Sequence, residues 1–249
     1  MAIFRTFRPD GSLQFDAAIT PYCLLEKGYV STVSTTGSNP HWSGNSPSSA
    51  LIPMNYDSDE LIALYLPGYG YARYANLSWN GSWWHIFHTM APVGSLVTYY
   101  RFAYATTIPG YGGAGLQLFN PAGQRTFHSS MRPAIVAGTL SGLYSGISLP
   151  AGRQYASVVQ TQAGHERTTW SGGQDVITDD KGQVIAIVWT GDSDQKLYGV
   201  RWLTQDSAQL VEVEFNGGPV QSASPTQPAD TQFYRNEIEN VLFLDVTNI

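Results

Sequence analysis

The sequence is poor in charge, in cysteine and in long apolar runs. Only 13% of its 249 residues are charged, about half of the share in an average globular protein, so uncharged polar residues and tyrosine must cover much of the surface. The net charge is -6, and the sequence has no cluster of Lys and Arg that would neutralise the phosphates of a nucleic acid. We therefore expect no nucleic-acid partner.

Cys23 is the single cysteine, which excludes an intrachain disulfide framework and a zinc site built on cysteines. We expect a buried thiol, because a free cysteine usually packs as a small apolar group. No run of 18 uncharged apolar residues occurs, and the first ten residues hold no apolar core of signal-peptide length. The sequence thus predicts a protein without a membrane span that folds in a cytoplasm.

Hydrophobic residues recur with period two in many short segments, for example in residues 183–189 and 210–215. Turn-forming sequences rich in Gly, Pro, Asn and Asp separate these segments. No stretch of a dozen residues shows a period of 3.6 without Gly or Pro. Alternation over short segments joined by close turns is typical of antiparallel strands, so we predict an all-β fold with little helix.

The C-terminal region contains a polar stretch. Residues 218–232 are dense in Pro, Ser, Thr and Gln, a composition that predicts a long loop. We expect this loop to let a final segment, residues 233–246, return to the body of the protein.

The sequence contains an internal repeat. Residues 7–21 align without gaps to residues 119–133, and Phe, Pro, Gly, Phe and Pro coincide at five of fifteen positions, where unrelated windows share roughly one. In each copy a strand would end at Phe, a tight turn would contain Pro and Gly, and a second strand would lead to the next Phe. Two similar turns arising by chance are the alternative.

The repeat offset of 112 residues is close to the length of one sandwich domain. We therefore predict two tandem antiparallel β-sandwich-like modules, residues 1–109 and residues 110–249.

Residues 115–130 of the second copy read Gly-Leu-Gln-Leu-Phe-Asn-Pro-Ala-Gly-Gln-Arg-Thr-Phe-His-Ser-Ser, and Arg132-Pro133 follows. This stretch resembles a hairpin of small tail proteins of tailed bacteriophages, with the pattern G-L-x-V-x-N-x-x-G-x-x-x-F-x-S-S. The resemblance covers residues 115–136. It is weaker in the first copy, where Asp16-Ala17-Ala18 replaces the Ser-Ser element.

The resemblance implies a non-enzymatic structural component of a tail tip or tail fibre of siphovirus-like phages and prophages. Such a protein would be located in the virion tail after assembly in the cytoplasm of the bacterial host. Its partners would be other tail proteins and a host-cell receptor, either a glycan or a protein. It would form a homo-oligomer, and threefold symmetry is common at tail ends. The resemblance implies no catalytic site.

Aromatic residues interspersed with glycine are the candidate contact surface. Tyr and Gly together give rigid, amphipathic contact area at low entropic cost, and indole rings nearby could stack on a sugar or pack at a subunit interface. Packing of the same rings in the core is the alternative. The candidates are Trp42, Tyr65, Tyr69, Tyr71, Arg73, Tyr74, Trp79 and Trp83.

A carbohydrate-binding, lectin-like module is the alternative function, because it needs only a β scaffold with exposed aromatic residues. A polysaccharide depolymerase is a weaker alternative, since paired carboxylates could come from Asp57, Asp59, Glu60, Asp175, Asp179 and Asp180.

His85 and His88 lie three residues apart on a predicted strand, so they point to opposite faces. No third ligand is near them in the sequence, and we predict neither a metal site nor a cofactor.

Overall fold

The computed structural model describes residues 5–7, 13–16, 20–34, 48–54, 60–79, 81–108, 114–159, 163–215, 219–224, 226–235 and 241–249. Every named element in these residues is a β-strand, and the strands pair antiparallel. The predicted all-β class is confirmed. None of the described segments forms a helix with the length and apolar character that crossing a bilayer requires.

A six-stranded sheet forms one layer of the body. β8 (Leu96–Tyr104) lies between β3 (Tyr22–Ser31) and β5 (Leu61–Tyr65) and is buried along most of its length, as expected for a strand whose side chains alternate between two covered faces. Across the sheet the strands are β11 (Ile135–Leu140), β19 (Val241–Asp245), β13 (Tyr155–Val158), β5 (Leu61–Tyr65), β8 (Leu96–Tyr104) and β3 (Tyr22–Ser31).

A nine-stranded sheet forms the second layer and continues beyond the body. Its main path is β12 (Gly146–Ser148), β16 (Ser207–Phe215), β15 (Val184–Trp202), β6 (Gly70–Trp79), β7 (Ser82–Thr89) and β4 (Ser48–Pro53). Three strands extend the sheet beside this path: β14 (Ala163–Thr178), β17 (Pro219–Ser224) and β18 (Thr231–Arg235).

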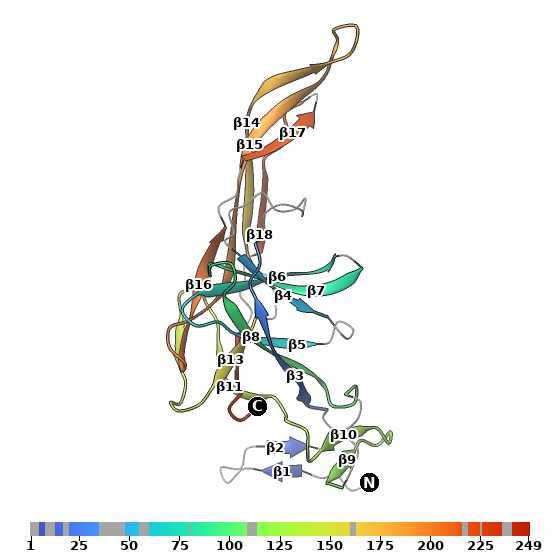
Figure 1. The fold of residues 1–249 in the computed structure, drawn as a ribbon, viewed down its shortest axis with the longest axis vertical. Coiled ribbons are helices and arrows are strands. Elements are labelled where there is room, and N and C mark those ends of the chain that lie inside the picture. Colours follow the sequence, from blue (N-terminus) through green and yellow to red (C-terminus); the bar gives the residue numbers. More distant parts are fainter. Residues whose placement is uncertain are drawn as a thin grey trace.

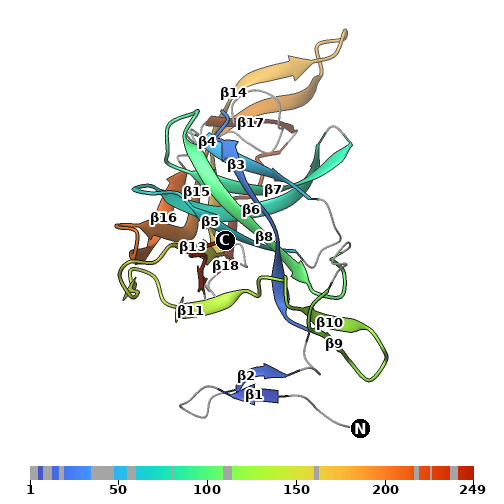
Figure 2. The same cartoon turned by 60° about the horizontal axis from the view of Figure 1, so that its bottom comes forward.

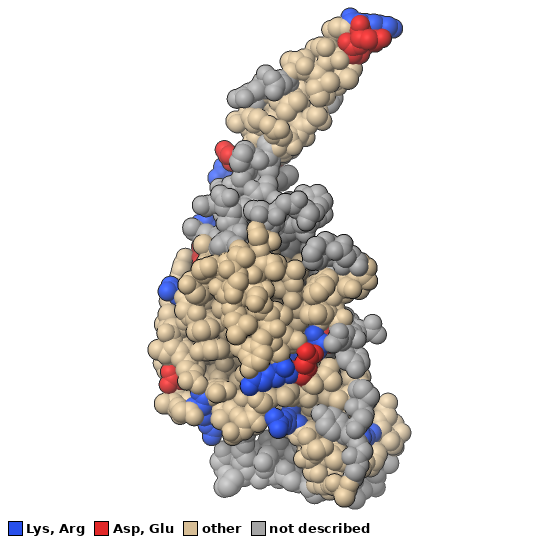
Figure 3. All heavy atoms as spheres, in the orientation of Figure 1, with Lys and Arg blue, Asp and Glu red and all other residues tan. Residues whose placement is uncertain are grey.

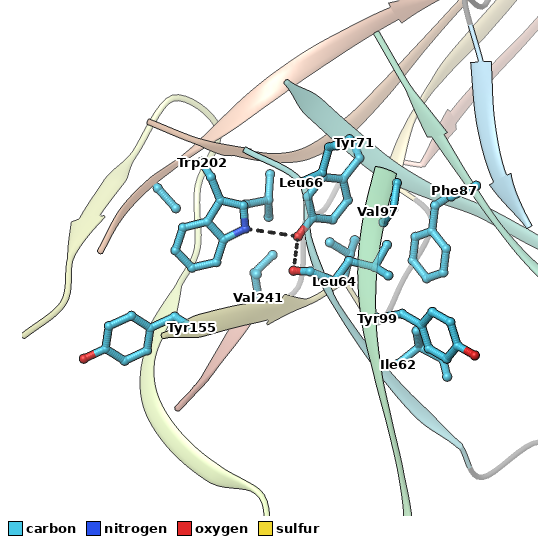
Figure 4. Close-up of a cluster of buried hydrophobic side chains, with 14 of the residues drawn as sticks. Ile62, Leu64, Leu66, Tyr71, Phe87, Val97, Tyr99, Tyr155, Trp202 and Val241 are labelled. Carbon is cyan, nitrogen blue, oxygen red and sulfur yellow. Dashed lines mark hydrogen bonds between the residues drawn. The ribbon is translucent and has the colours of Figure 1, made fainter. Parts of the chain in front are cut away.

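The two sheets pack against each other around one main core. Leu64 and Val241 of the six-stranded sheet belong to the same buried cluster as Tyr71, Phe87 and Trp202 of the nine-stranded sheet (Figure 4). The Trp202 and Phe243 rings meet edge to face, with centroids 5.4 Å apart. Burial of each large apolar side chain stabilises the fold by about 2 kcal/mol, so this cluster holds the layers together.

Strands from both sides of the predicted boundary at residues 109 and 110 share each sheet. β3, β5 and β8 pair into one sheet with β11, β13 and β19, while β4, β6 and β7 join β15 and β16 in the other. The main core likewise contains side chains of both halves. The boundary therefore does not separate two packed modules, because each half supplies strands to both layers of one sandwich-like body.

The two copies of the repeat form the same hairpin. β1 (Arg5–Phe7) pairs with β2 (Leu13–Asp16), and β9 (Gln117–Phe119) pairs with β10 (Arg125–His128), so each strand of the second hairpin lies 112 residues after its equivalent. Both ladders also shift register at the equivalent step next to the turn. The hairpin predicted at the start of each half is confirmed, and Figures 1 and 2 show both hairpins at one end of the molecule.

An arm projects from the other end of the molecule (Figure 1). It is the hairpin of β14 and β15, whose pairing runs from Ala163 opposite Tyr198 to Thr178 opposite Val184. β15 has 19 residues, which is about 60 Å at the rise of a strand. It therefore runs from the tip of the arm into the body, where its last residue, Trp202, is buried in the core.

The C-terminal region differs in part from the prediction of a loop over residues 218–232. Pro219–Ser224 form β17, which pairs with residues 187–192 of β15. Proline is accommodated because it is the first residue of the strand, and the stretch covers an edge of β15 that would otherwise be unpaired. The final segment does return to the body, since β19 lies between β11 and β13 and buries Phe243 and Leu244.

Candidate functional site

Tyr71, one of the predicted contact residues, is part of the core and is only 1% exposed. Its hydroxyl lies 2.7 Å from the Leu64 carbonyl, beside the Ser157 hydroxyl, and 3.3 Å from Trp202 Nε1 (Figure 4). A carbonyl only accepts, so Tyr71 donates to Leu64, and Ser157 and Trp202 donate to the Tyr71 oxygen. Burial raises the pKa of Tyr71 above its ordinary value. Tyr71 is therefore a structural residue, and its place in the contact surface is corrected.

Two other predicted residues are half-buried. The Tyr65 ring packs on the core and meets the Trp202 ring edge to face, with centroids 5.5 Å apart. Burial raises the pKa of Tyr65, and burial lowers the pKa of Arg73. Both side chains thus contribute to packing and leave only part of their surface for a partner.

Tyr69 and Trp83 are the predicted residues that the structure shows exposed, at 41% and 56%. Tyr69 precedes β6, and Trp83 is paired with Ser78 near the other end of that strand. β6 has ten residues, so the two rings are about 30 Å apart at the rise of a strand. They offer two separate spots and do not form one surface.

The remaining predicted residues give no contact geometry. Tyr74 and Trp79 belong to β6, but the structure does not describe their side chains. Trp42 lies outside the described residues. The described residues of the expected aromatic surface therefore do not form one surface. Some pack in or on the core, and the two exposed rings lie far apart.

The aromatic pattern did not identify the exposed apolar side chains of the second hairpin and of β11. Leu116 and Phe119 of the second hairpin are exposed, as are Ile135 and Val136 at the start of the edge strand β11. Large apolar side chains that gather on a surface commonly mark an interaction site. The repeat itself contained the signal, because Leu116 and Phe119 align with two phenylalanines in the first copy.

Backbone hydrogen bonds of the residues that follow the second hairpin fix it to the body. Leu24 N donates to Arg132 O at 2.8 Å, and Ala134 N donates to Tyr22 O at 2.8 Å. The Arg125 guanidinium also donates to the Ile108 carbonyl at 3.3 Å. The exposed apolar residues of this hairpin are therefore presented by a firmly held element.

A buried ionic network connects three strands of the body. Arg101 in β8 is fully buried, and its guanidinium lies 3.1 Å from a Glu26 oxygen and 3.6 Å from a Glu60 oxygen. His85 Nε2 lies 3.2 Å from the same Glu60 oxygen, and the Tyr99 hydroxyl donates to Glu26 at 2.5 Å. Buried charges need such partners to offset their lost hydration, so the network is a structural feature of the core.

Among the acidic residues considered for glycoside cleavage, the three whose side chains are described do not converge. Glu60 belongs to the buried network, whereas Asp179 and Asp180 lie in the turn at the tip of the arm. The Asp179 carboxylate accepts hydrogen bonds from the backbone N–H groups of Lys181 and Gln183, as turn aspartates commonly do. Asp57 and Asp59 lie outside the described residues, as does the side chain of Asp175.

The histidine pair and the cysteine are buried in the body. His88 Nδ1 lies 2.6 Å from the Ser49 hydroxyl, and burial lowers the pKa of His88 well below its ordinary value. Burial raises the pKa of Cys23 to about 11, and the predicted buried thiol is confirmed. Among the described residues there is no group of three or more His, Cys, Asp or Glu side chains placed to hold a metal ion.

Comparison with family models, with curated proteins and with solved structures found no match for this chain. The features of the chain that bear on its function are therefore its own. These are the repeated hairpin, the exposed apolar and aromatic side chains, and the arm.

Proposed function

We propose that this chain is a non-enzymatic structural component of a phage tail tip or tail fibre. The observation that carries the proposal is the repeated hairpin. The resemblance to tail proteins depends on a short motif, and both copies of that motif fold into hairpins with the same strands, the same register and the same irregularity. The motif thus corresponds to a defined structural unit that the chain uses twice.

The arrangement of the molecule suits a component that joins neighbours. The hairpins lie at one end, the arm projects at the other end, and the sandwich-like body lies between them (Figures 1 and 2). Exposed apolar residues occur on the second hairpin and on the arm, where partners could cover them. In this proposal the protein assembles in the host cytoplasm, resides in the virion tail, and contacts other tail proteins or a host receptor.

A hairpin variant in the phage tests this role. Leu116→Ser with Phe119→Ser changes two exposed residues, so the purified variant should keep its fold while its incorporation into purified particles falls at least tenfold. Leu203→Ser is the matched control, because Leu203 is equally exposed but lies on the body, and this variant should be incorporated normally. Equal incorporation of all three proteins would contradict a role of the hairpin in tail assembly.

A carbohydrate-binding module is the second candidate function, and the exposure of Tyr69 and Trp83 favours it. Each ring offers an apolar face on which a sugar could stack. Because the rings lie far apart, each would form its own site. Trp83→Ala should then abolish binding of one set of immobilised glycans and leave the set recognised through Tyr69 unchanged. If the purified protein retains no glycan at all, this candidate is excluded.

A further inference from the structure

One face of the six-stranded sheet points away from the nine-stranded sheet, and a row of hydroxyl-bearing side chains lies on it. Val97 and Tyr99 of β8 belong to the main core between the sheets. Successive residues of a strand point to opposite faces, so Thr98, which lies between them, points outward. Its cross-strand neighbours are Tyr29 of β3 and Tyr65 of β5, and directly opposed residues share a face. These three side chains therefore form one row across three strands, which we call the outer row.

Tyr100 lies beside the outer row. It is two residues from Thr98 on β8, so it points to the same face, and it belongs to a cluster separate from the main core. The Lys27 ammonium lies 5.5 Å from the centroid of its ring. Burial raises the pKa of Tyr100, and the Tyr29 and Tyr65 hydroxyls raise this pKa further. Such an influence requires proximity, so the three phenol hydroxyls lie near one another.

The Tyr100 hydroxyl has no hydrogen-bond partner within the part of the chain that the structure describes, although only 4% of the residue is exposed. The other buried tyrosines each donate a hydrogen bond to a carbonyl or carboxylate oxygen; they are Tyr71, Tyr99 and Tyr155. Buried hydroxyls normally have a partner, so Tyr100 is the exception. Among the described residues, the hydroxyls of Tyr29, Tyr65 and Thr98 have no hydrogen-bond partner either. The site thus holds four hydroxyls whose hydrogen-bonding capacity is unused.

We propose that the outer row and Tyr100 bind an uncharged saccharide. A sugar ring presents C–H groups that stack on the faces of tyrosine rings. Its hydroxyls both donate and accept hydrogen bonds, as the phenol and threonine hydroxyls of the site do. Neighbouring strands are about 4.8 Å apart, so the outer row spans about 10 Å. A short stretch of a glycan that lies above the smaller Thr98 contacts the rings of both Tyr29 and Tyr65.

The charges around the site favour an uncharged ligand. Lys27 is the charged residue paired with Tyr100, and its ammonium already donates to the Ile249 carbonyl at 3.0 Å. Arg101, the next residue of β8, is fully buried in the ionic network. The surface of the body is also poor in charge, since Figure 3 shows only small patches of charged side chains on the face in view. The described residues of the site therefore offer hydroxyls and ring faces, which suit a neutral polar ligand.

This site uses neither Tyr69 nor Trp83, the two exposed rings considered above. The inference rests on the carbohydrate-binding candidate, to which it assigns a site, and it does not depend on the location of the protein in a phage tail. Binding measured on the purified chain and labelling measured on phage particles can therefore fail independently.

Saturation-transfer NMR and titration of the purified full chain test the proposal. The probes are uncharged hexasaccharides of glucose, mannose, galactose and N-acetylglucosamine at millimolar concentration, and the wild-type chain should bind at least one of them. Tyr29→Ala should weaken this binding at least about tenfold, because it removes one of the two rings. The variant should keep its fold, because Tyr29 is 59% exposed. A wild-type chain that binds none of the probes would overturn the proposal.

Tyr100→Phe separates binding from packing. It removes only a hydroxyl without a partner among the described residues, so the thermal unfolding midpoint should not fall, whereas the affinity should drop about fivefold through the loss of one hydrogen bond. Tyr144→Phe is the matched control at an exposed tyrosine, and it should bind like the wild type. Unchanged affinity in Tyr29→Ala or in Tyr100→Phe would overturn the proposal. Loss of binding in Trp83→Ala with unchanged binding in Tyr29→Ala would assign the glycan to the other candidate ring, which also overturns it.

Discussion

Replacing Tyr71 with phenylalanine tests whether this tyrosine is a core residue. The Tyr71 hydroxyl donates to Leu64 and accepts from Ser157 and Trp202, so all of its hydrogen-bonding capacity is used. Tyr71→Phe leaves the Ser157 hydroxyl and the Trp202 indole N–H buried without this partner. Each buried group that loses its partner costs about 1 to 3 kcal/mol. For the two groups together we therefore expect the free energy of unfolding to fall by about 2 to 6 kcal/mol.

Thermal unfolding followed by tryptophan fluorescence measures this loss. For a chain of this size 1 kcal/mol shifts the midpoint by about 2 to 4 °C, so the Tyr71→Phe midpoint should fall by at least about 4 °C and by up to about 24 °C. Tyr69→Phe is the control, because Tyr69 is exposed, and its unfolding free energy should stay within about 0.5 kcal/mol of the wild type. Adding Ser157→Ala to Tyr71→Phe should cost less than the sum of the two single changes, because the substitutions share one interaction. A Tyr71→Phe protein as stable as Tyr69→Phe would refute the reasoning.

Three further predictions concern other parts of the body. Gly199→Ala should lower the unfolding free energy by at least about 2 kcal/mol in a denaturation assay, because the added Cβ would lie 2.0 Å from the Tyr71 carbonyl oxygen. Gly146→Ala is the control and should be tolerated, because the atom nearest to its added Cβ is 3.6 Å away. Burial raises the pKa of Asp245, but hydrogen bonds from Thr247 and Arg153 outweigh this and lower it. Asp245 therefore stabilises the fold above the ordinary carboxyl pKa of about 4, and this contribution disappears as the pH falls through the lowered pKa. The stability difference between the wild type and Asp245→Asn should accordingly be largest at neutral pH and shrink in acid. A difference that grows in acid would contradict a lowered pKa of Asp245. Cys23, with its pKa near 11, should react with a thiol reagent at pH 8 only after denaturant is added, and labelling of the native protein would contradict its burial.

Local features of the fold could be predicted from the sequence because they depend on neighbouring residues. Residues 184–189 of the period-two pattern lie in β15, the partner strand of β14, and the repeated Phe-Pro-Gly pattern corresponds to two hairpins of equal register. These signals report strand pairing and turns over a few residues, and the same physical rules govern every antiparallel hairpin.

Features that depend on distant parts of the chain could not be predicted in the same way. Sequence spacing indicated two modules, but β5 pairs on one side with β13 from the other half of the chain, and no local pattern specifies such a pairing. Tyr69 and Tyr71 lie in one aromatic stretch, yet one is exposed and the other is buried. On one strand these two residues would share a face, but Tyr69 lies before β6 begins at Gly70, and the sequence does not mark where the strand starts.

The location of the protein in the phage particle is the most direct test of the proposed function. Immunogold electron microscopy of particles from the source lysate, with antibody raised against the purified chain, would determine that location. We predict gold at the distal end of the tail. Intact particles without label, alongside protein detected only in the soluble fraction of the lysate, would contradict a structural role in the tail.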